Sequence, residues 1–181
     1  SGSGKTTLCK VLQAARPDIS WSVSCTTREP RPNEIDGTDY HFNSQEKFLK
    51  YIGDDAFAEW EDVHGQRYGT LKLNLDTAIN NNRTLLLDLD VKGAMSIQNL
   101  YPEQSFSIFI LPPSIDHLRR RLRKRGTDSE SMIKTRLQRF EKEMEYKSKF
   151  DYLLINDDLE VAGRELIDVV NGLKEGGLNG Y

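Results

Sequence analysis

The chain has 181 residues, of which 37% are hydrophobic and 29% are charged, a composition typical of one soluble globular domain. Its formal net charge of −3 excludes a general nucleic-acid-binding coat, and the lack of a long apolar run excludes a membrane span. Two cysteines are too few for a disulfide framework, so we expect a reducing, cytoplasmic location.

Apolar residues recur along the chain with alternating helical and strand-like periods. This pattern predicts helices at residues 8–15, 44–52, 71–80, 93–100, 114–124, 127–149 and 159–172. It predicts strands at residues 19–24, 39–42, 57–63, 84–89, 105–111 and 152–155. The strands at 84–89 and 105–111 are apolar enough to be buried on both faces. The alternation predicts an α/β fold in which helices cover both faces of a parallel sheet.

Two segments interrupt this pattern. Residues 26–82 contain short strands and many polar side chains, so we interpret them as an inserted lobe. Residues 124–137 are rich in arginine and are interpreted as a short lid. The remaining segments, about 1–25, 83–123 and 138–172, form the core of a single domain. The glycine-rich tail from residue 174 to 181 is expected to fray.

The chain opens with Ser1-Gly2-Ser3-Gly4-Lys5-Thr6-Thr7, most of the phosphate-binding pattern G-x-x-x-x-G-K-[ST]. Its glycines let backbone N–H groups converge on one anion, and the helix that follows points its positive dipole end the same way. Lys5 suits the β- and γ-phosphates of a nucleotide, and the Thr6 hydroxyl suits Mg²⁺. A flexible Gly/Ser-rich terminus is the alternative. Because the first glycine of the pattern is missing, we expect an apolar strand and a Gly-Pro-type turn before Ser1.

A second group of anion-binding side chains follows. Arg28 and Arg31 lie on a proline-stiffened loop and can grip one phosphate from two sides. Tyr40 and Tyr68 offer hydroxyl donors to the same phosphate. Glu59 is a carboxylate inside an apolar strand, where it needs donors that a purine base can provide. The alternatives are a solvated basic loop, a tyrosine-bearing core and a surface glutamate.

Two further clusters carry charge. An apolar strand is followed by Asp88 and Asp90, which fits a carboxylate near Mg²⁺, although Asp90 can instead cap a helix. Six of the seven residues from 119 to 125 are basic. Arg125, beside Gly126, and Arg136 are placed to reach over phosphates, whereas other members of this run are expected on a solvated helix surface.

Taken together, the motifs resemble those of the guanylate kinases in the nucleotide kinase family. The strings that carry the resemblance occur in the family's order and are residues 1–7, 22–32, 36–42, 68–70, 87–93, 125–127 and 156–158. They extend over about residues 1 to 172. Lys92 stands where glutamine is common in the family, and Arg67 where tyrosine or another polar residue is usual.

The resemblance implies that the γ-phosphoryl group of ATP is transferred to GMP, and that dGMP is a possible second acceptor. Mg²⁺ is implied as cofactor, with Thr6 and Asp88 as its ligands. Implied GMP ligands are Ser24, Arg28, Arg31, Glu34, Tyr40 and Tyr68, with Glu59, Thr70 and Asp90 reading guanine. Implied ATP ligands are Ser1, Gly2, Ser3, Gly4, Lys5, Thr6, Thr7, Arg125 and Asn156, the last near adenine. Implied catalytic residues are Lys5, Arg28, Arg125 and Arg136. The inserted lobe would then bind GMP.

Two other functions remain open on the sequence. One is a catalytically inactive guanylate-kinase-like binding module, against which Lys5, Thr6 and the two lid arginines argue. The other is a related P-loop kinase with a different phosphorylated acceptor, against which Glu59 and Thr70 argue. The expected partners are small molecules, GMP and ATP, and neither nucleic acid nor a membrane. The sequence does not distinguish a monomer from a homodimer.

Overall fold

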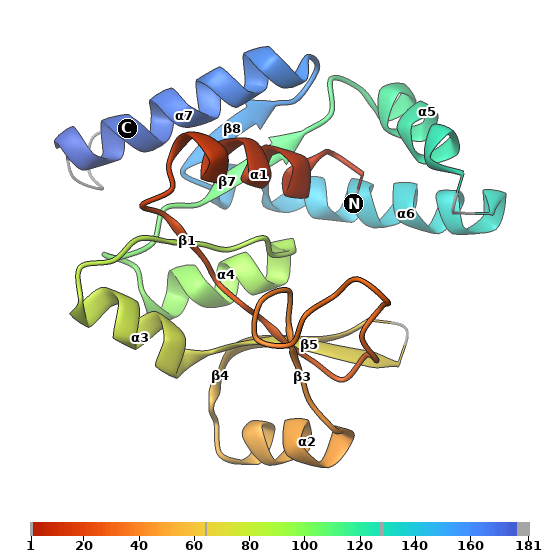
Figure 1. Ribbon diagram of the computed structural model, residues 1–181. Coiled ribbons are helices and arrows are strands. Elements are labelled where there is room, and N and C mark those ends of the chain that lie inside the picture. Colours follow the sequence, from red (N-terminus) through yellow and green to blue (C-terminus); the bar gives the residue numbers. More distant parts are fainter. Residues whose placement is uncertain (1, 64, 127–128, 177–181) are drawn as a thin grey trace. The chain divides into compact units, whose positions relative to one another are not determined.

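A computed structural model describes residues 2–63, 65–126 and 129–176, except for the side chains of residues 125 and 174–176 (Figure 1). Backbone contacts divide the chain into unit 1, Ser1–Arg16 with Glu103–Tyr181, and unit 2, Pro17–Pro102. No helix in these described ranges is both long and apolar enough to cross a membrane.

Unit 1 joins the beginning of the chain to its last third. Its elements are α1 (Lys5–Ala15), β7 (Ile108–Leu111), α5 (Ile115–Arg125), α6 (Glu130–Glu143), the 3₁₀ helix η1 (Met144–Lys149), β8 (Tyr152–Ile155) and α7 (Leu159–Gly176). Strands β7 and β8 pair in parallel, and α1 packs against α7 (Figure 1). A buried cluster joins α5 to α6 and consists of Leu118, Leu122, Ile133, Leu137 and Phe140.

Unit 2 holds the middle of the chain. Its elements are β1 (Ser20–Trp21), β2 (Cys25–Thr26), β3 (His41–Phe42), α2 (Gln45–Gly53), β4 (Phe57–Val63), β5 (Gln66–Leu71), α3 (Lys72–Asn80), β6 (Leu85–Leu86) and α4 (Val91–Leu100). Four strands form a mixed sheet in the order β3-β2-β5-β4, in which β4 and β5 are an antiparallel hairpin. Strands β1 and β6 form a separate parallel pair.

Aromatic side chains fill the centre of unit 2 between α2 and the mixed sheet. Phe48 on α2 is fully buried, and its ring centroid lies 4.4 Å from that of Phe57 on β4. Cys25 packs in the same cluster, and burial raises the pKa of its thiol to about 11. This cluster holds α2 on the sheet, since each of its three members comes from a different element.

Several predicted elements match the structure closely. The strands predicted at 57–63 and 152–155 are β4 and β8 with the same bounds. The helices predicted at 44–52 and 114–124 are α2 and α5, and the Ser44 and Ser114 side chains cap them by accepting a hydrogen bond from the backbone N–H three residues on. Both features depend on short-range patterns that a sequence displays directly.

The central strands differ from the prediction. The strands predicted at 19–24 and 84–89 have only two residues each, β1 and β6, and the residues of β6 are half-buried rather than buried on both faces. In the described part of the chain each of these strands is paired on one side only, by the other. Strand β5 was not predicted, since its residues lack apolar alternation; pairing with β4 and β2 on its two sides makes it a strand.

Two helix boundaries also differ. The helix predicted over 127–149 begins at Glu130, because the Ser129 side chain accepts from the N–H of Met132, and it becomes 3₁₀ at Met144. The first two residues of the predicted range, 127 and 128, lie outside the described residues. The last helix continues to Gly176 instead of ending at residue 172, so the start of the tail predicted to fray is helical.

Replacing Phe48 by Ala should test the aromatic cluster of unit 2. Removing a fully buried ring leaves a cavity, so the free energy of unfolding in urea should fall by about 3–5 kcal/mol. Leu49→Ala is the control. Leu49 is the next residue on α2 and its side chain is 50% exposed, so this substitution should change the free energy of unfolding by less than about 0.5 kcal/mol. Equal losses in both variants would contradict this account of the core.

Candidate functional site

The loop before α1 presents backbone N–H groups at the start of that helix. Gly2 and Gly4 have left-handed φ angles of 83° and 95°, and Gly4 is the N-cap of α1 without a side-chain hydrogen bond. The first turn of α1 carries no acidic residue. The first N–H groups of a helix have no partners within it, and its dipole makes this end positive. The loop therefore has the features of an anion-binding site.

Helix α5 supports this loop through two buried leucines. A Cβ atom on Gly2 would lie 2.9 Å from Leu118 Cδ1 and equally close to Leu122 Cδ2. Any side chain at Gly2 would therefore push against the core of unit 1, in addition to being strained at a positive φ.

The loop after β8 supports Gly4 and its neighbour. Asn156 is buried, and its Nδ2 donates a 2.8 Å hydrogen bond to the carbonyl oxygen of Ser3. A Cβ atom on Gly4 would collide with the same Nδ2. The role predicted for Asn156 near adenine stays a prediction, and the structure gives its amide a partner in the phosphate-binding loop.

Three other residues of the loop were predicted to bind ATP. Lys5 is half-buried at the first position of α1, and Thr6 and Thr7 are exposed at the next two. Ser1 lies outside the described residues. A lysine and a hydroxyl at the start of a helix are suited to phosphate and to Mg²⁺, respectively.

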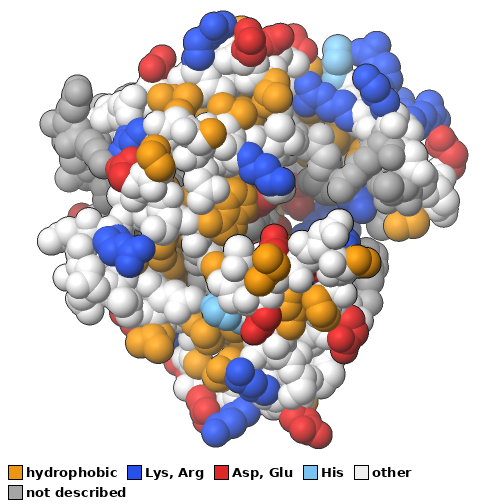
Figure 2. All heavy atoms as spheres, in the orientation of Figure 1, with side chains coloured by type: hydrophobic (Ala, Val, Ile, Leu, Met, Phe, Trp, Pro, Cys, Tyr) orange, Lys and Arg blue, Asp and Glu red, His pale blue; other side chains and the backbone are white. Residues whose placement is uncertain are grey.

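Part of the basic run on α5 is used within unit 1. Figure 2 shows Lys and Arg side chains gathered over this helix. Arg119 pairs with Asp116 at 2.9 Å, and Arg123 forms two hydrogen bonds with Glu130 on α6. Arg121 donates to backbone carbonyls in the loop after β8. Arg121 and Arg123 therefore join α5 to other segments of unit 1, whereas the Arg119 pair lies within α5.

The two arginines expected to reach over phosphates lie on different helices. The side chain of Arg125, the last residue of α5, is outside the described residues, and Gly126 caps this helix with a φ of 69°. Arg136 is half-buried on α6. Their catalytic role stays a prediction.

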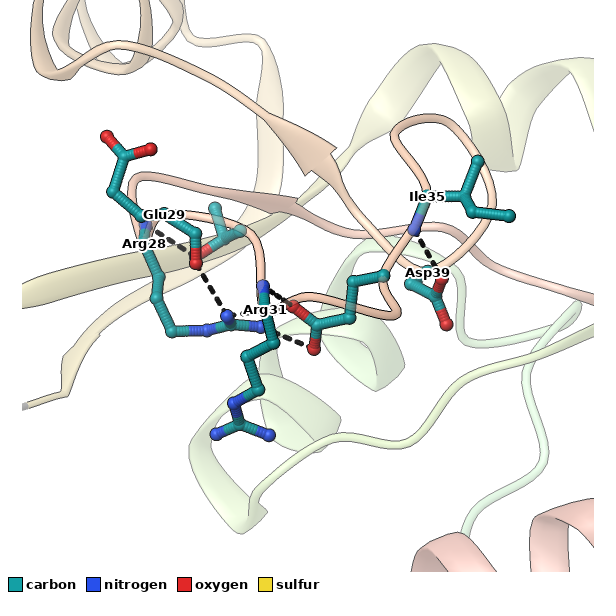
Figure 3. A network of polar contacts seen from close by, with 7 residues as sticks. Arg28, Glu29, Arg31, Ile35 and Asp39 are labelled. Carbon is teal, nitrogen blue, oxygen red and sulfur yellow. Dashed lines mark hydrogen bonds and ion pairs between the residues drawn. The ribbon is translucent and has the colours of Figure 1, made fainter.

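In unit 2 a carboxylate holds the loop that carries Arg28 and Arg31 (Figure 3). Arg28 donates two hydrogen bonds to Glu34, of 2.9 and 2.8 Å, and the backbone N–H of Arg31 donates a third at 2.8 Å. Hydrogen bonds from Arg28 and then from the Arg31 N–H lower the pKa of the Glu34 carboxyl. Glu34 in turn raises the pKa of Arg28. The phosphate grip predicted for the two arginines stays a prediction; Glu34 holds one guanidinium in place.

Aromatic rings surround the Arg28 guanidinium. Its Cζ lies 5.4 Å from the ring centroid of Tyr40 and 5.7 Å from that of Phe42, within the range of a cation–π contact. Tyr68 meets Tyr40 edge-on at 6.0 Å between centroids, and burial raises the pKa of Tyr40. Register explains the gathering, since Thr26 of β2 is opposite Phe42 on one side and Tyr68 on the other. Strand pairing therefore places Phe42 and Tyr68 on the two sides of Thr26, and Tyr40 precedes β3 by one residue.

The three residues predicted to read guanine also meet in unit 2. Thr70 is fully buried and donates a 2.6 Å hydrogen bond to Glu59 Oε1 across the hairpin. Asp90 caps α4 by accepting a 2.8 Å hydrogen bond from the N–H of Gly93. A Cβ atom on Gly93 would lie 3.1 Å from Glu59 Oε2 and 3.3 Å from Asp90 Oδ1. Gly93 thus leaves room for two carboxylates, a role that sequence reasoning missed.

Burial, and then the nearby Asp90 charge, raises the pKa of the Glu59 carboxyl, while the Thr70 hydroxyl acts in the opposite direction. Asp90 fulfils the alternative considered for it, helix capping, and its role in reading guanine stays a prediction. The environment favours a ligand that brings donors to these carboxylates.

Two predicted ligands lie beside these clusters. Asp88 is half-buried between β6 and α4, and its charge contributes to raising the pKa of Tyr40. Ser24 is half-buried, and its carbonyl accepts a hydrogen bond from the N–H of His41. Within the described ranges no group of three or more His, Cys, Asp or Glu residues is arranged to hold a metal ion.

Comparison with known proteins gives a consistent result. A family model described as guanylate kinase matches residues 1–173. A guanylate kinase of Maricaulis maris (strain MCS10) is 44% identical over 171 residues, 94% of this chain and 78% of that relative. A guanylate kinase of Carboxydothermus hydrogenoformans is 44% identical over 174 residues, 96% of this chain and 85% of that relative.

A solved structure shares the fold. The crystal structure of guanylate kinase from Anaplasma phagocytophilum matches with a TM-score of 0.76 and 29% identity, and the match covers 96% of this chain and 84% of that one. This likeness confirms the predicted α/β fold class.

The raised pKa of Glu59 predicts a pH dependence of stability. Because the folded pKa lies above the unfolded one, ionisation of Glu59 costs folding free energy. As pH rises from below the ordinary carboxyl pKa of about 4.3 through the raised value, the wild type should lose stability relative to Glu59→Gln. Urea unfolding of both proteins across this range measures the difference. Parallel stability curves would show that Glu59 ionises in the folded protein as it does in water.

Proposed function

The chain belongs to the guanylate kinase family, and we propose how its residues divide the work of transferring the γ-phosphoryl group of ATP to GMP. The enzyme is an ATP:GMP phosphotransferase, since named guanylate kinases are 41–44% identical over nearly its whole length. Neither a catalytically inactive binding module nor a kinase with another acceptor is favoured. The observation that best supports the acceptor site is the meeting of Glu59 and Asp90 at Gly93, with the Thr70 hydroxyl bonded to Glu59.

On the acceptor side, Glu59 and Asp90 bind the guanine edge. Guanine carries N–H donors on its Watson–Crick edge, and ionised carboxylates are pure acceptors. The Thr70 hydroxyl occupies one oxygen of Glu59 and orients the group. Adenine presents an unprotonated nitrogen in place of one donor, which would face a carboxylate lone pair and be rejected.

The GMP phosphate is bound by side chains near the Arg28 loop. Arg28 and Arg31 contribute positive charge, and Ser24, Tyr40 and Tyr68 contribute hydroxyl donors. Glu34 is unsuited to a direct contact with a phosphate, because both are anions. It acts instead through Arg28, whose guanidinium it holds beside the rings of Tyr40 and Phe42.

On the donor side, residues 1–7 bind the ATP phosphates through the backbone N–H groups of the loop and the Lys5 ammonium. Thr6 and Asp88 offer a hydroxyl and a carboxylate, the hard oxygen ligands that Mg²⁺ takes from proteins alongside nucleotide phosphates. When bound, Mg²⁺ would neutralise charge on the β- and γ-phosphates. Arg125 and Arg136 add positive charge from the predicted lid, and Asn156 belongs to the same side.

The transfer needs no covalent enzyme intermediate. An oxygen of the GMP phosphate attacks the γ-phosphorus of ATP, and the bond to the bridging oxygen of ADP breaks. Lys5 and the arginines offset the repulsion between two polyanions and stabilise the charge spread over the transferring group. Closure of the predicted lobe (26–82) and lid (124–137) on the core would exclude water, to which the phosphoryl group would otherwise be lost.

The setting we propose is purine nucleotide metabolism in the cytoplasm. Both cysteines of the chain, Cys9 and Cys25, are thiols, which suits a reducing compartment. GMP, and dGMP as a second acceptor, are the proposed partners besides ATP; no nucleic acid or membrane is proposed.

An acceptor screen tests this function. ADP release is measured with ATP and Mg²⁺ and with each of GMP, dGMP, AMP, CMP and UMP in turn. Rapid release should require GMP or dGMP. Release that is equal for all five acceptors, or absent with all of them, would contradict the assignment.

Lys5→Ala should abolish most phosphoryl transfer and leave GMP binding intact. Lys5 acts on the ATP phosphates, and loss of one preorganised charged donor lowers kcat by about 100-fold or more. Lys10→Ala is the matched control, because Lys10 is exposed on the same helix, and it should keep near-normal turnover. Titration with GMP measures the acceptor affinity of both variants. Near-normal kcat in Lys5→Ala would mean that the loop does not bind the transferred phosphate.

Glu59→Gln should relax the preference for guanine. The substitution keeps the shape of the side chain but replaces one acceptor oxygen with a donor, so kcat/KM for GMP should fall and the GMP-to-AMP ratio should narrow. Hydrogen bonds to charged groups contribute roughly 1.5–3 kcal/mol, so we expect the ratio to fall at least about tenfold. Glu46→Gln, an exposed change on α2, is the control. An unchanged ratio in Glu59→Gln would place the guanine site elsewhere.

A further inference from the structure

We infer that Asn156 is a positioning residue for the phosphate-binding loop, because its side-chain amide fixes the direction of the Ser3–Gly4 peptide group. The inference rests on the proposed function, since it names what keeps the ATP-binding loop in shape. It concerns the phosphates of ATP, whereas the role predicted for Asn156 from the family resemblance concerns adenine.

The bond that carries the inference is buried at both ends. Asn156 Nδ2 donates to the Ser3 carbonyl oxygen at 2.8 Å, and each of the two residues is only 4% exposed. A buried carbonyl without a donor carries a large desolvation penalty, so this carbonyl stays on Asn156.

The geometry of a peptide group turns this bond into a constraint on the loop. In a trans peptide the carbonyl of one residue and the N–H of the next point in opposite directions. With the Ser3 carbonyl fixed on Asn156, the Gly4 N–H must point away from Asn156. A flip of this peptide would replace an N–H donor with a carbonyl oxygen, which repels phosphate. Gly4 also has no room for a side chain, because a Cβ atom would collide with Asn156 Nδ2.

Asn156 is itself held on two sides. Its backbone N–H donates to the Leu111 carbonyl at 2.7 Å and so extends the pairing of β7 with β8 by one residue. Its carbonyl accepts from Arg121 Nη2 at 2.8 Å, and the same nitrogen donates to the Asp157 carbonyl at 3.0 Å. The amide therefore acts from a fixed base that β7 and α5 provide.

Tripolyphosphate separates the two roles of Asn156, because it carries the phosphates of ATP without a base. Affinities of Asn156→Ala for ATP and for tripolyphosphate, both with Mg²⁺, are measured by calorimetry and compared with wild type. If the Ser3–Gly4 peptide is misdirected, the affinities for both ligands should fall by a similar factor. We expect about tenfold or more, the effect of one lost hydrogen bond to a charged group. In steady-state assays KM for ATP should rise and kcat should fall, while the GMP affinity stays within about twofold because GMP does not use this peptide.

Two further variants accompany this measurement. Asn171→Ala removes an exposed asparagine that accepts a hydrogen bond from Arg16, the C-cap residue of α1, and it should leave both affinities unchanged. Arg121→Ala loosens the base of Asn156 without touching the amide, so it should weaken ATP and tripolyphosphate together by a smaller factor. It also keeps the test available if Asn156→Ala does not fold.

Each other outcome is decisive. Loss of ATP affinity with unchanged tripolyphosphate affinity would assign Asn156 to adenine and overturn the inference. Unchanged affinity for both ligands, or an equal loss of GMP affinity, would also overturn it. Failure of the wild type to bind either ligand would overturn the proposed function instead.

Discussion

Unit 1 depends on a constraint of the peptide group. A loop that offers its N–H groups to an anion must direct the carbonyls of the same peptides elsewhere, and a buried carbonyl needs a donor. Gly2 and Gly4 allow the backbone conformation, and the leucines of α5 occupy the space into which a side chain at Gly2 would project. Asn156 supplies the donor that the buried Ser3 carbonyl needs. A short motif at one end of the chain is thus completed by residues more than a hundred positions away.

In unit 2 the constraint is electrostatic, because two carboxylates, those of Glu59 and Asp90, lie close together. Glu59 and Asp90 both approach Gly93; the Thr70 hydroxyl donates to Glu59, and the backbone N–H of Gly93 donates to Asp90. Burial and the nearby Asp90 charge raise the pKa of the Glu59 carboxyl and so oppose its ionisation. A base edge with N–H donors would relieve that repulsion, which is why we propose that these two carboxylates select guanine.

The sequence predicted those features that depend on neighbouring residues. The phosphate-binding loop is a contiguous string, the serine caps of α2 and α5 lie next to their helices, and β4 shows its own alternation. Features that depend on distant partners left no such pattern. Strand β5 is polar and becomes a strand through its two neighbours, and the partner of Asn156 is fixed only by the fold.

The same reasoning explains which contacts of the candidate site residues the sequence could indicate. Arg28, Tyr40 and Tyr68 were predicted from residue type and from family resemblance, whereas the pairing of Glu34 with Arg28 is visible only in the structure. The sequence did not indicate that Gly93 leaves room for the two carboxylates, because a glycine in the first turn of a helix has no distinctive sequence pattern around it. The three side chains proposed to read guanine lie on β4, on β5 and at the N-cap of α4, and none of them belongs to unit 1. If they choose the acceptor base, substitutions confined to one hairpin and one helix start would alter that choice and leave the glycine loop before α1 unchanged.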